Sequence, residues 1–60
     1  NRIMMKPRLG MTARTGDKCP KSGVWKAMGT FETVTLSVSR GNRMPTHENK
    51  STTWKLIIMF

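Results

Sequence analysis

The alternation of apolar and hydroxyl side chains over residues 33–39 constrains the fold more than any other feature of this chain. Val34, Leu36 and Val38 alternate with threonine and serine. A period of two places the apolar side chains on one face of a strand and the hydroxyl groups on the other. β-Branched residues, which favour extended backbone, dominate the stretch. We therefore expect a half-buried strand with one face in water.

Two further segments have the composition of strands and are bounded by turn residues. The first covers residues 24–28 and is closed by Gly29, and the second covers residues 52–60. Strict alternation along the second segment predicts that four apolar side chains share one face: Trp54, Leu56, Ile58 and Phe60. Its other face is polar at first and apolar at its end, which indicates a central strand or an interface.

These segments together predict the fold class. A short additional strand is expected near residues 9–13, and no stretch of the chain has a helical period. The sequence thus predicts an all-β protein, either a small antiparallel meander or an open SH3-like barrel. We expect residues 15–60 to form a single small β domain, preceded by a basic N-terminal arm at residues 1–14.

The chain has 60 residues and one cysteine, Cys19. One cysteine cannot form an internal disulfide. Together with His47, the only histidine, it would supply half of the roughly four ligands of a structural zinc ion. We therefore expect neither a metal nor a cofactor. Because so small a domain has a limited core, a second copy bound through the C-terminal strand is one expected source of stability.

The single cysteine and the lack of a long apolar run bear on the cellular location of the protein. An unpaired thiol favours a reducing compartment, so a cytoplasmic location is expected, and export after removal of a signal peptide stays open. No apolar run approaches the roughly 20 residues of a transmembrane segment.

Charge is the strongest functional signal in the sequence. Eleven Lys and Arg residues against three Asp and Glu residues give a net charge of +8. Such a surface attracts an acidic protein surface or nucleic acid. Seven of the basic residues lie in the first half of the chain and are the expected contacts to a partner or anion: Arg2, Lys6, Arg8, Arg14, Lys18, Lys21 and Lys26.

Catalytic patterns are missing from the sequence. Cys19 is not part of a CxxC pair, and only His47 could serve it as a base. Asp17, Glu32 and Glu48 are widely separated and do not have the spacing of a catalytic carboxylate pair. We therefore predict no catalytic residue and no enzymatic activity.

Residues 15–25, TGDKCPKSGVW, combine turn residues with the only cysteine and one of the two tryptophans. We interpret this segment as a tight turn that leads into a strand, with Cys19 packed as a small apolar group. The tryptophans are expected to be core anchors, with a base-stacking platform as the alternative. The predicted structural anchors are Gly16, Cys19, Pro20, Gly23, Trp25, Pro45 and Trp54.

The pattern Gly16-x-x-Cys19-Pro20-x-Ser22-Gly23-x-Trp25, followed by Gly41-x-x-Met44-Pro45 and Thr52-x-Trp54, resembles a small bacterial module. Some proteins with this module are associated with toxin and immunity loci, including those of type VI secretion. The resemblance covers about residues 15–55 and implies a compact β module held by the Cys-Pro turn and the two tryptophans. It implies no catalytic residue.

Two functions follow as expectations. The first is a non-enzymatic β module that binds a protein partner of the toxin, immunity or secretion-accessory kind through its basic face and apolar C-terminal strand. The alternative is a nucleic-acid-binding protein whose basic N-terminal half contacts phosphates. A basic peptide acting at membranes is a weaker third option, because the arm has no clear amphipathic face.

Overall fold

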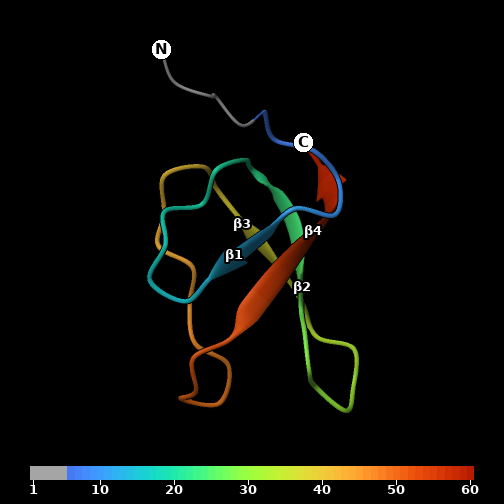
Figure 1. The fold of residues 1–60 in the computed structure, drawn as a ribbon, viewed down its shortest axis with the longest axis vertical. Coiled ribbons are helices and arrows are strands. Elements are labelled where there is room, and N and C mark those ends of the chain that lie inside the picture. Colours follow the sequence, from blue (N-terminus) through green and yellow to red (C-terminus); the bar gives the residue numbers. More distant parts are fainter. Residues whose placement is uncertain (1–5) are drawn as a thin grey trace.

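The computed structural model describes residues 6–60, which contain four strands and no helix, and so no helix that could cross a membrane. The strands form one open antiparallel sheet in the order β1-β4-β2-β3 (Figure 1). The predicted all-β class is therefore confirmed. The strands are β1 at Thr12–Arg14, β2 at Gly23–Ala27, β3 at Thr35–Val38 and β4 at Thr53–Met59.

Strand β4 lies in the middle of the sheet, between β1 and β2. This position agrees with the two-sided apolar character of its last residues. The pairing of β4 with β1 continues to the two residues that precede β1, because Gly10 N donates to Leu56 O at 2.8 Å and Leu56 N donates to Met11 O at 2.9 Å. The sheet therefore includes part of the segment that was expected to belong to the arm.

A β-bulge in β4 changes which side chains share a face. Leu56 pairs with Trp25, whereas Ile58 pairs with Val24, so that Ile57 is an extra residue in the register. Paired residues lie on the same face of a sheet, and Val24 and Trp25 lie on opposite faces. Ile58 therefore lies on the face opposite to Leu56. Continued alternation places Phe60 on the same face as Ile58.

The expectation that Trp54, Leu56, Ile58 and Phe60 share one face is thus wrong. Trp54 and Leu56 are buried, with exposed fractions of 2% and 0%, whereas Ile58 and Phe60 are 51% and 67% exposed. The alternation rule fails here because one extra residue shifts the phase of every residue that follows it. We call the face with Trp25, Trp54 and Leu56 the core face, and the face with Val24, Lys26, Lys55 and Ile58 the outer face.

Gly23 allows β2 and β4 to approach closely beside the bulge. A Cβ atom at this position would overlap the carbonyl oxygen of Ile58 and lie 2.9 Å from Leu56 Cδ1. Only glycine fits a place where a second backbone comes this near.

Two connecting segments cover the core face, so the molecule has a sheet layer and a loop layer (Figure 1). Residues 16–22 and 39–44 run beside each other, with Cys19 N bonded to Asn42 O and Gly41 N bonded to Cys19 O. Buried Cys19 and Met44 come from these loops, and the remaining core residues come from the strands: Ala13, Trp25, Ala27, Val38, Trp54 and Leu56.

Both indole groups tie the loop layer to the sheet. Trp25 Nε1 donates to Lys21 O at 3.2 Å, and Trp54 Nε1 donates to Pro45 O at 2.9 Å. Each tryptophan thereby fills part of the core, and its indole N–H has the hydrogen-bond acceptor that a buried donor requires. Both act as the core anchors that the sequence predicted.

Candidate polyanion interface

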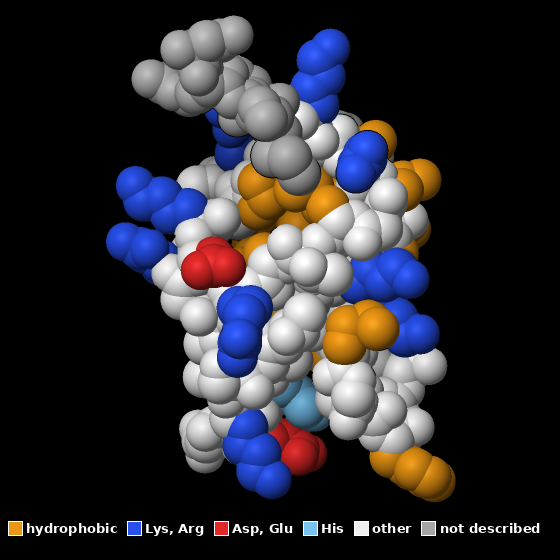
Figure 2. Space-filling model, viewed as in Figure 1, with side chains coloured by type: hydrophobic (Ala, Val, Ile, Leu, Met, Phe, Trp, Pro, Cys, Tyr) orange, Lys and Arg blue, Asp and Glu red, His pale blue; other side chains and the backbone are white. Residues whose placement is uncertain are grey.

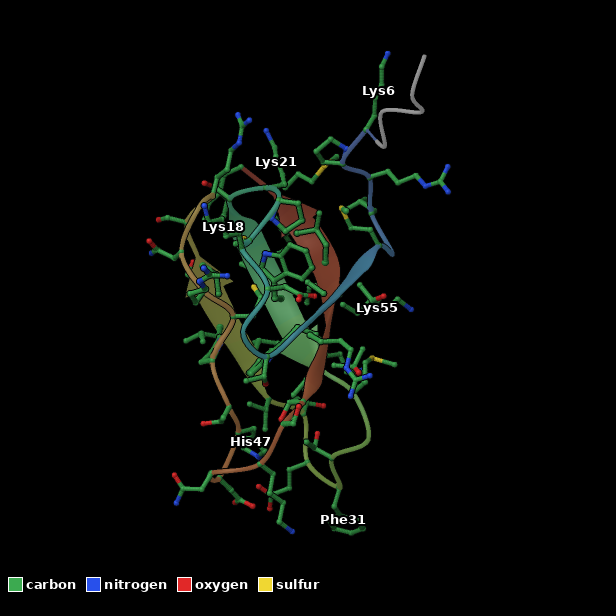
Figure 3. All side chains as sticks on the ribbon, turned by 60° about the vertical axis from the view of Figure 1, so that its left-hand side comes forward. Lys6, Lys18, Lys21, Phe31, His47 and Lys55 are labelled. Carbon is green, nitrogen blue, oxygen red and sulfur yellow. The ribbon has the colours of Figure 1, made fainter. Side chains whose placement is uncertain are left out.

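The first group of cations lies on the loop layer. Lys18 is directly opposite Arg43 in an isolated antiparallel bridge. Lys21 and Arg40 are brought close to this pair because the two loop segments are hydrogen-bonded to each other, with Arg40 N donating to Ser22 Oγ at 2.8 Å. We call these four residues, Lys18, Lys21, Arg40 and Arg43, the loop surface. Figure 3 shows Lys18 and Lys21 near the same end of the molecule.

The second group lies on the outer face of the sheet. Lys26 of β2 is directly opposite Lys55 of β4. Thr12 pairs with Lys55 on one side, and Thr35 pairs with Lys26 on the other. The four side chains form one row across all four strands, and the row is partly or fully exposed along its length. Lys55 lies on the flank away from Lys18 in Figure 3.

These two groups contain the same unusual arrangement, a cation directly opposite another cation on the neighbouring strand. Like charges in such a position destabilise the pairing. Among residues 6–60, no Lys or Arg side chain lies within 4.0 Å of an Asp or Glu carboxylate, and only His47 Nε2 approaches one, the Glu48 carboxylate, at 4.0 Å. Neither pair therefore has a carboxylate within 4.0 Å in the described chain, and Arg43 Nη1 donates to the carbonyl oxygen of Gly16 at 2.8 Å.

Two of the three acidic residues lie away from these pairs, and the third, Asp17, precedes Lys18 but makes no ion pair within 4.0 Å among the described residues. Glu32 and Glu48 line a common hollow with Phe31 and Lys50, at the end of the molecule that Figure 3 marks by Phe31 and His47. The carboxylate of Asp17 accepts a hydrogen bond from Arg14 N at 2.9 Å and so holds a turn. Figure 2 shows basic side chains along both flanks and acidic side chains at only two places on the face in view.

The predicted contact residues do not form one continuous surface. Arg2 lies outside the described residues. Lys6 and Arg8 line an open hollow that ends at Thr12, beside the outer-face row. Lys18 and Lys21 belong to the loop surface, and Lys26 belongs to the outer face. Arg14 is exposed on β1, where it pairs with Thr53.

Three cations in these groups were not among the predicted contacts: Arg40, Arg43 and Lys55. They come from the second half of the chain, where the charge density is lower. Only the strand order brings Lys55 beside Lys26, and only the pairing of the loops brings Arg43 beside Lys18. The distribution of charge along the sequence therefore does not predict the Lys26–Lys55 pair or the Lys18–Arg43 pair.

The remaining candidates have structural roles. The burial of both tryptophans leaves neither ring free to stack on a base. Cys19 is 1% exposed, and its Sγ lies 3.1 Å from Lys21 O and 3.8 Å from Val38 O. These neighbours are carbonyl groups, and neither of them is a base that could activate the thiol. Within the described part of the chain, no group of three or more His, Cys, Asp or Glu residues could hold a metal ion.

Cys19→Ser is expected to lower the free energy of unfolding by about 1–2 kcal/mol and to leave ligand affinity unchanged. The hydroxyl can still donate to Lys21 O, but it is smaller and more polar than the thiol in a buried position. Urea unfolding followed by tryptophan fluorescence measures the first effect. A loss of affinity in the folded variant would mean that the thiol takes part in binding.

Comparison with protein-family models, curated proteins and solved structures gives no match to this chain. The resemblance to the bacterial toxin-and-immunity module therefore stays a prediction. The class that the fold and the site define is a small all-β protein with two exposed cationic surfaces.

Proposed function

We propose that this chain is a non-enzymatic module that binds the phosphate backbone of a nucleic acid. The observation that carries this proposal is the presence of two cation pairs, Lys18–Arg43 and Lys26–Lys55, each directly opposed and without a carboxylate of the described residues within 4.0 Å. A phosphate between the two members of a pair would relieve their repulsion and accept hydrogen bonds from both.

The surroundings of the Lys18–Arg43 pair favour a nucleic acid over an acidic protein. A protein interface usually has a desolvated apolar centre with aromatic anchors. Around Lys18 and Arg43 the loops instead expose polar side chains and backbone, and both tryptophans are buried. Hydroxyl groups of Thr12 and Thr35 flank the second pair, and such side chains commonly contact phosphates. The protein partner implied by the resemblance remains the alternative.

Lys18→Glu tests the proposal by a pair of opposite effects. The substitution converts a repulsive pair into an ion pair with Arg43, so the free energy of unfolding is expected to rise by about 0.2–1 kcal/mol. Affinity for duplex DNA is expected to fall, and the slope of log K against log salt is expected to decrease by about one or more. Titrations between roughly 50 and 200 mM salt measure the slope.

Lys50→Glu is the matched control, because it changes the net charge equally at the end of the molecule that contains Glu32 and Glu48. A smaller loss of affinity is expected for it than for Lys18→Glu. Equal losses would indicate general attraction by net charge and would contradict a binding site at the loop surface. If the unaltered protein binds no nucleic acid at roughly 50 mM salt, the proposal is wrong and the protein-partner alternative is left.

A further inference from the structure

The outer face has an apolar part beside its lysine pair. Val24 pairs with Ile58 in the row next to Lys26 and Lys55, on the same face of the sheet. Phe60 follows on this side, with its backbone N bonded to Ser22 O at 3.0 Å. Ile58 and Phe60 are 51% and 67% exposed. One continuous surface therefore has cations at one end and an exposed aromatic ring at the other.

The bulge at Ile57 is the physical reason for this combination. Without the extra residue, Ile58 and Phe60 would lie on the core face with Leu56. With it, both side chains lie in line with Lys55 along β4, over roughly 16 Å at about 3.3 Å per residue. We call Thr12, Val24, Lys26, Thr35, Lys55, Ile58 and Phe60 the sheet surface.

We infer that the sheet surface binds a single-stranded nucleic acid, with backbone phosphates at Lys26 and Lys55 and an unpaired base on the ring of Phe60. This inference rests on the proposed function and specifies its ligand. Nonspecific single-strand binding combines a positively charged track with aromatic rings on which bases stack. The hydroxyl groups of Thr12 and Thr35 can donate to further phosphate oxygens at the two ends of the lysine row.

A single strand fits this surface better than a duplex. The faces of paired bases are hidden within the stack of a duplex, so a duplex could use only the lysines and would leave Ile58 and Phe60 in water. An unpaired base offers a flat apolar face that can cover these side chains. The cations of the loop surface adjoin the Phe60 end of the sheet surface through Ser22, and they suit a backbone of either kind.

Phe60→Ala separates the two ligands. The variant is expected to bind short oligo(dT) about 5- to 150-fold more weakly than the unaltered protein, which corresponds to the loss of one base stack. Its affinity for a duplex of the same length is expected to stay unchanged. Phe31→Ala is the matched control, because Phe31 is fully exposed in the loop between β2 and β3 and lies at the end of the molecule away from the C-terminus (Figures 1 and 3).

The double variant Lys26→Ala, Lys55→Ala tests the phosphate contacts. The salt slope for oligo(dT) is expected to decrease by about 1.4, since a single strand contributes about 0.7 per neutralised phosphate. Circular dichroism checks that each variant is folded, and removal of the opposed lysines is expected to leave the sheet intact.

The outcomes distinguish this inference from the proposed function. Equal effects of Phe60→Ala and Phe31→Ala on oligo(dT), or an unchanged slope in the double lysine variant, would overturn the inference. Duplex binding that still depends on Lys18 would then leave the proposed function standing. If the unaltered protein binds neither oligo(dT) nor duplex at roughly 50 mM salt, both are wrong. Self-association that is abolished by Phe60→Ala, without nucleic-acid binding, would assign the same surface to a second copy.

Discussion

Gly23→Ala is expected to prevent the chain from folding. The added methyl group would overlap the carbonyl oxygen of Ile58, which belongs to the backbone of β4 and cannot move by a change of rotamer. The β2–β4 pairing joins the two halves of the sheet, so moving these strands apart would expose Trp25 and Leu56. A domain of this length has a free energy of unfolding of about 3–9 kcal/mol. The cost of a backbone clash of this kind is expected to be comparable to that total. Circular dichroism and urea unfolding measure the result.

Gly41→Ala is the matched control for this substitution. Gly41 has a φ of 90°, but no heavy atom lies within 4 Å of the position of an added Cβ. The control therefore has only the backbone cost of a left-handed residue, about 1–2 kcal/mol, and is expected to fold. If Gly23→Ala were as stable as Gly41→Ala, the close approach of β2 and β4 at the bulge would be wrong.

Trp54→Ala is expected to lower the free energy of unfolding by about 3–5 kcal/mol. The indole is 2% exposed and lies in a row between Ala13 and Ala27, its partners on β1 and β2. Because both neighbours are small, neither can fill the space that the ring leaves, and the full cavity remains. Urea unfolding followed by the fluorescence of Trp25 measures the change.

Trp54→Phe separates the volume of the ring from its hydrogen bond. The substitution removes the indole N–H but leaves Pro45 O with a donor, since Thr15 Oγ1 lies 2.7 Å from the same oxygen. The expected loss is therefore only about 1–2 kcal/mol, most of it from reduced packing. A loss as large as that of Trp54→Ala would mean that the tie between the loop layer and the sheet, and not the filling of the core, supplies the stability.

The loops connect stability to the proposed function. Lys21 offers its carbonyl oxygen to the buried indole of Trp25, and its side chain belongs to the loop surface. Lys18 precedes Cys19, whose side chain is in the core. The residues that close the core therefore also hold the cations in place, so a ligand bound to the loop surface would stabilise the folded state.

Much of the fold could be predicted from local patterns. The alternation at residues 33–39 indicated β3, and the run that begins at Val24 indicated β2, because strands have a period of two. The expected burial of β3 was right only in part, since Val38 is buried whereas Leu36 is 42% exposed at the edge of the sheet. The core roles of Trp25, Trp54 and Cys19 also followed from composition, since a chain this small has few other large or apolar residues to bury. The positive charge was equally plain in the sequence, and it favoured an anionic partner.

The sequence by itself determined the β class of the fold, the main core anchors and the positive charge, because each depends on residue type or on nearest neighbours along the chain. The tertiary structure alone decided which cations meet, since Lys26 meets Lys55, and Lys18 meets Arg43, only through strand order and loop pairing. It also decided the face of Ile58 and Phe60, because the bulge at Ile57 arises from how β4 fits against β2, and one extra residue reverses the alternation beyond it.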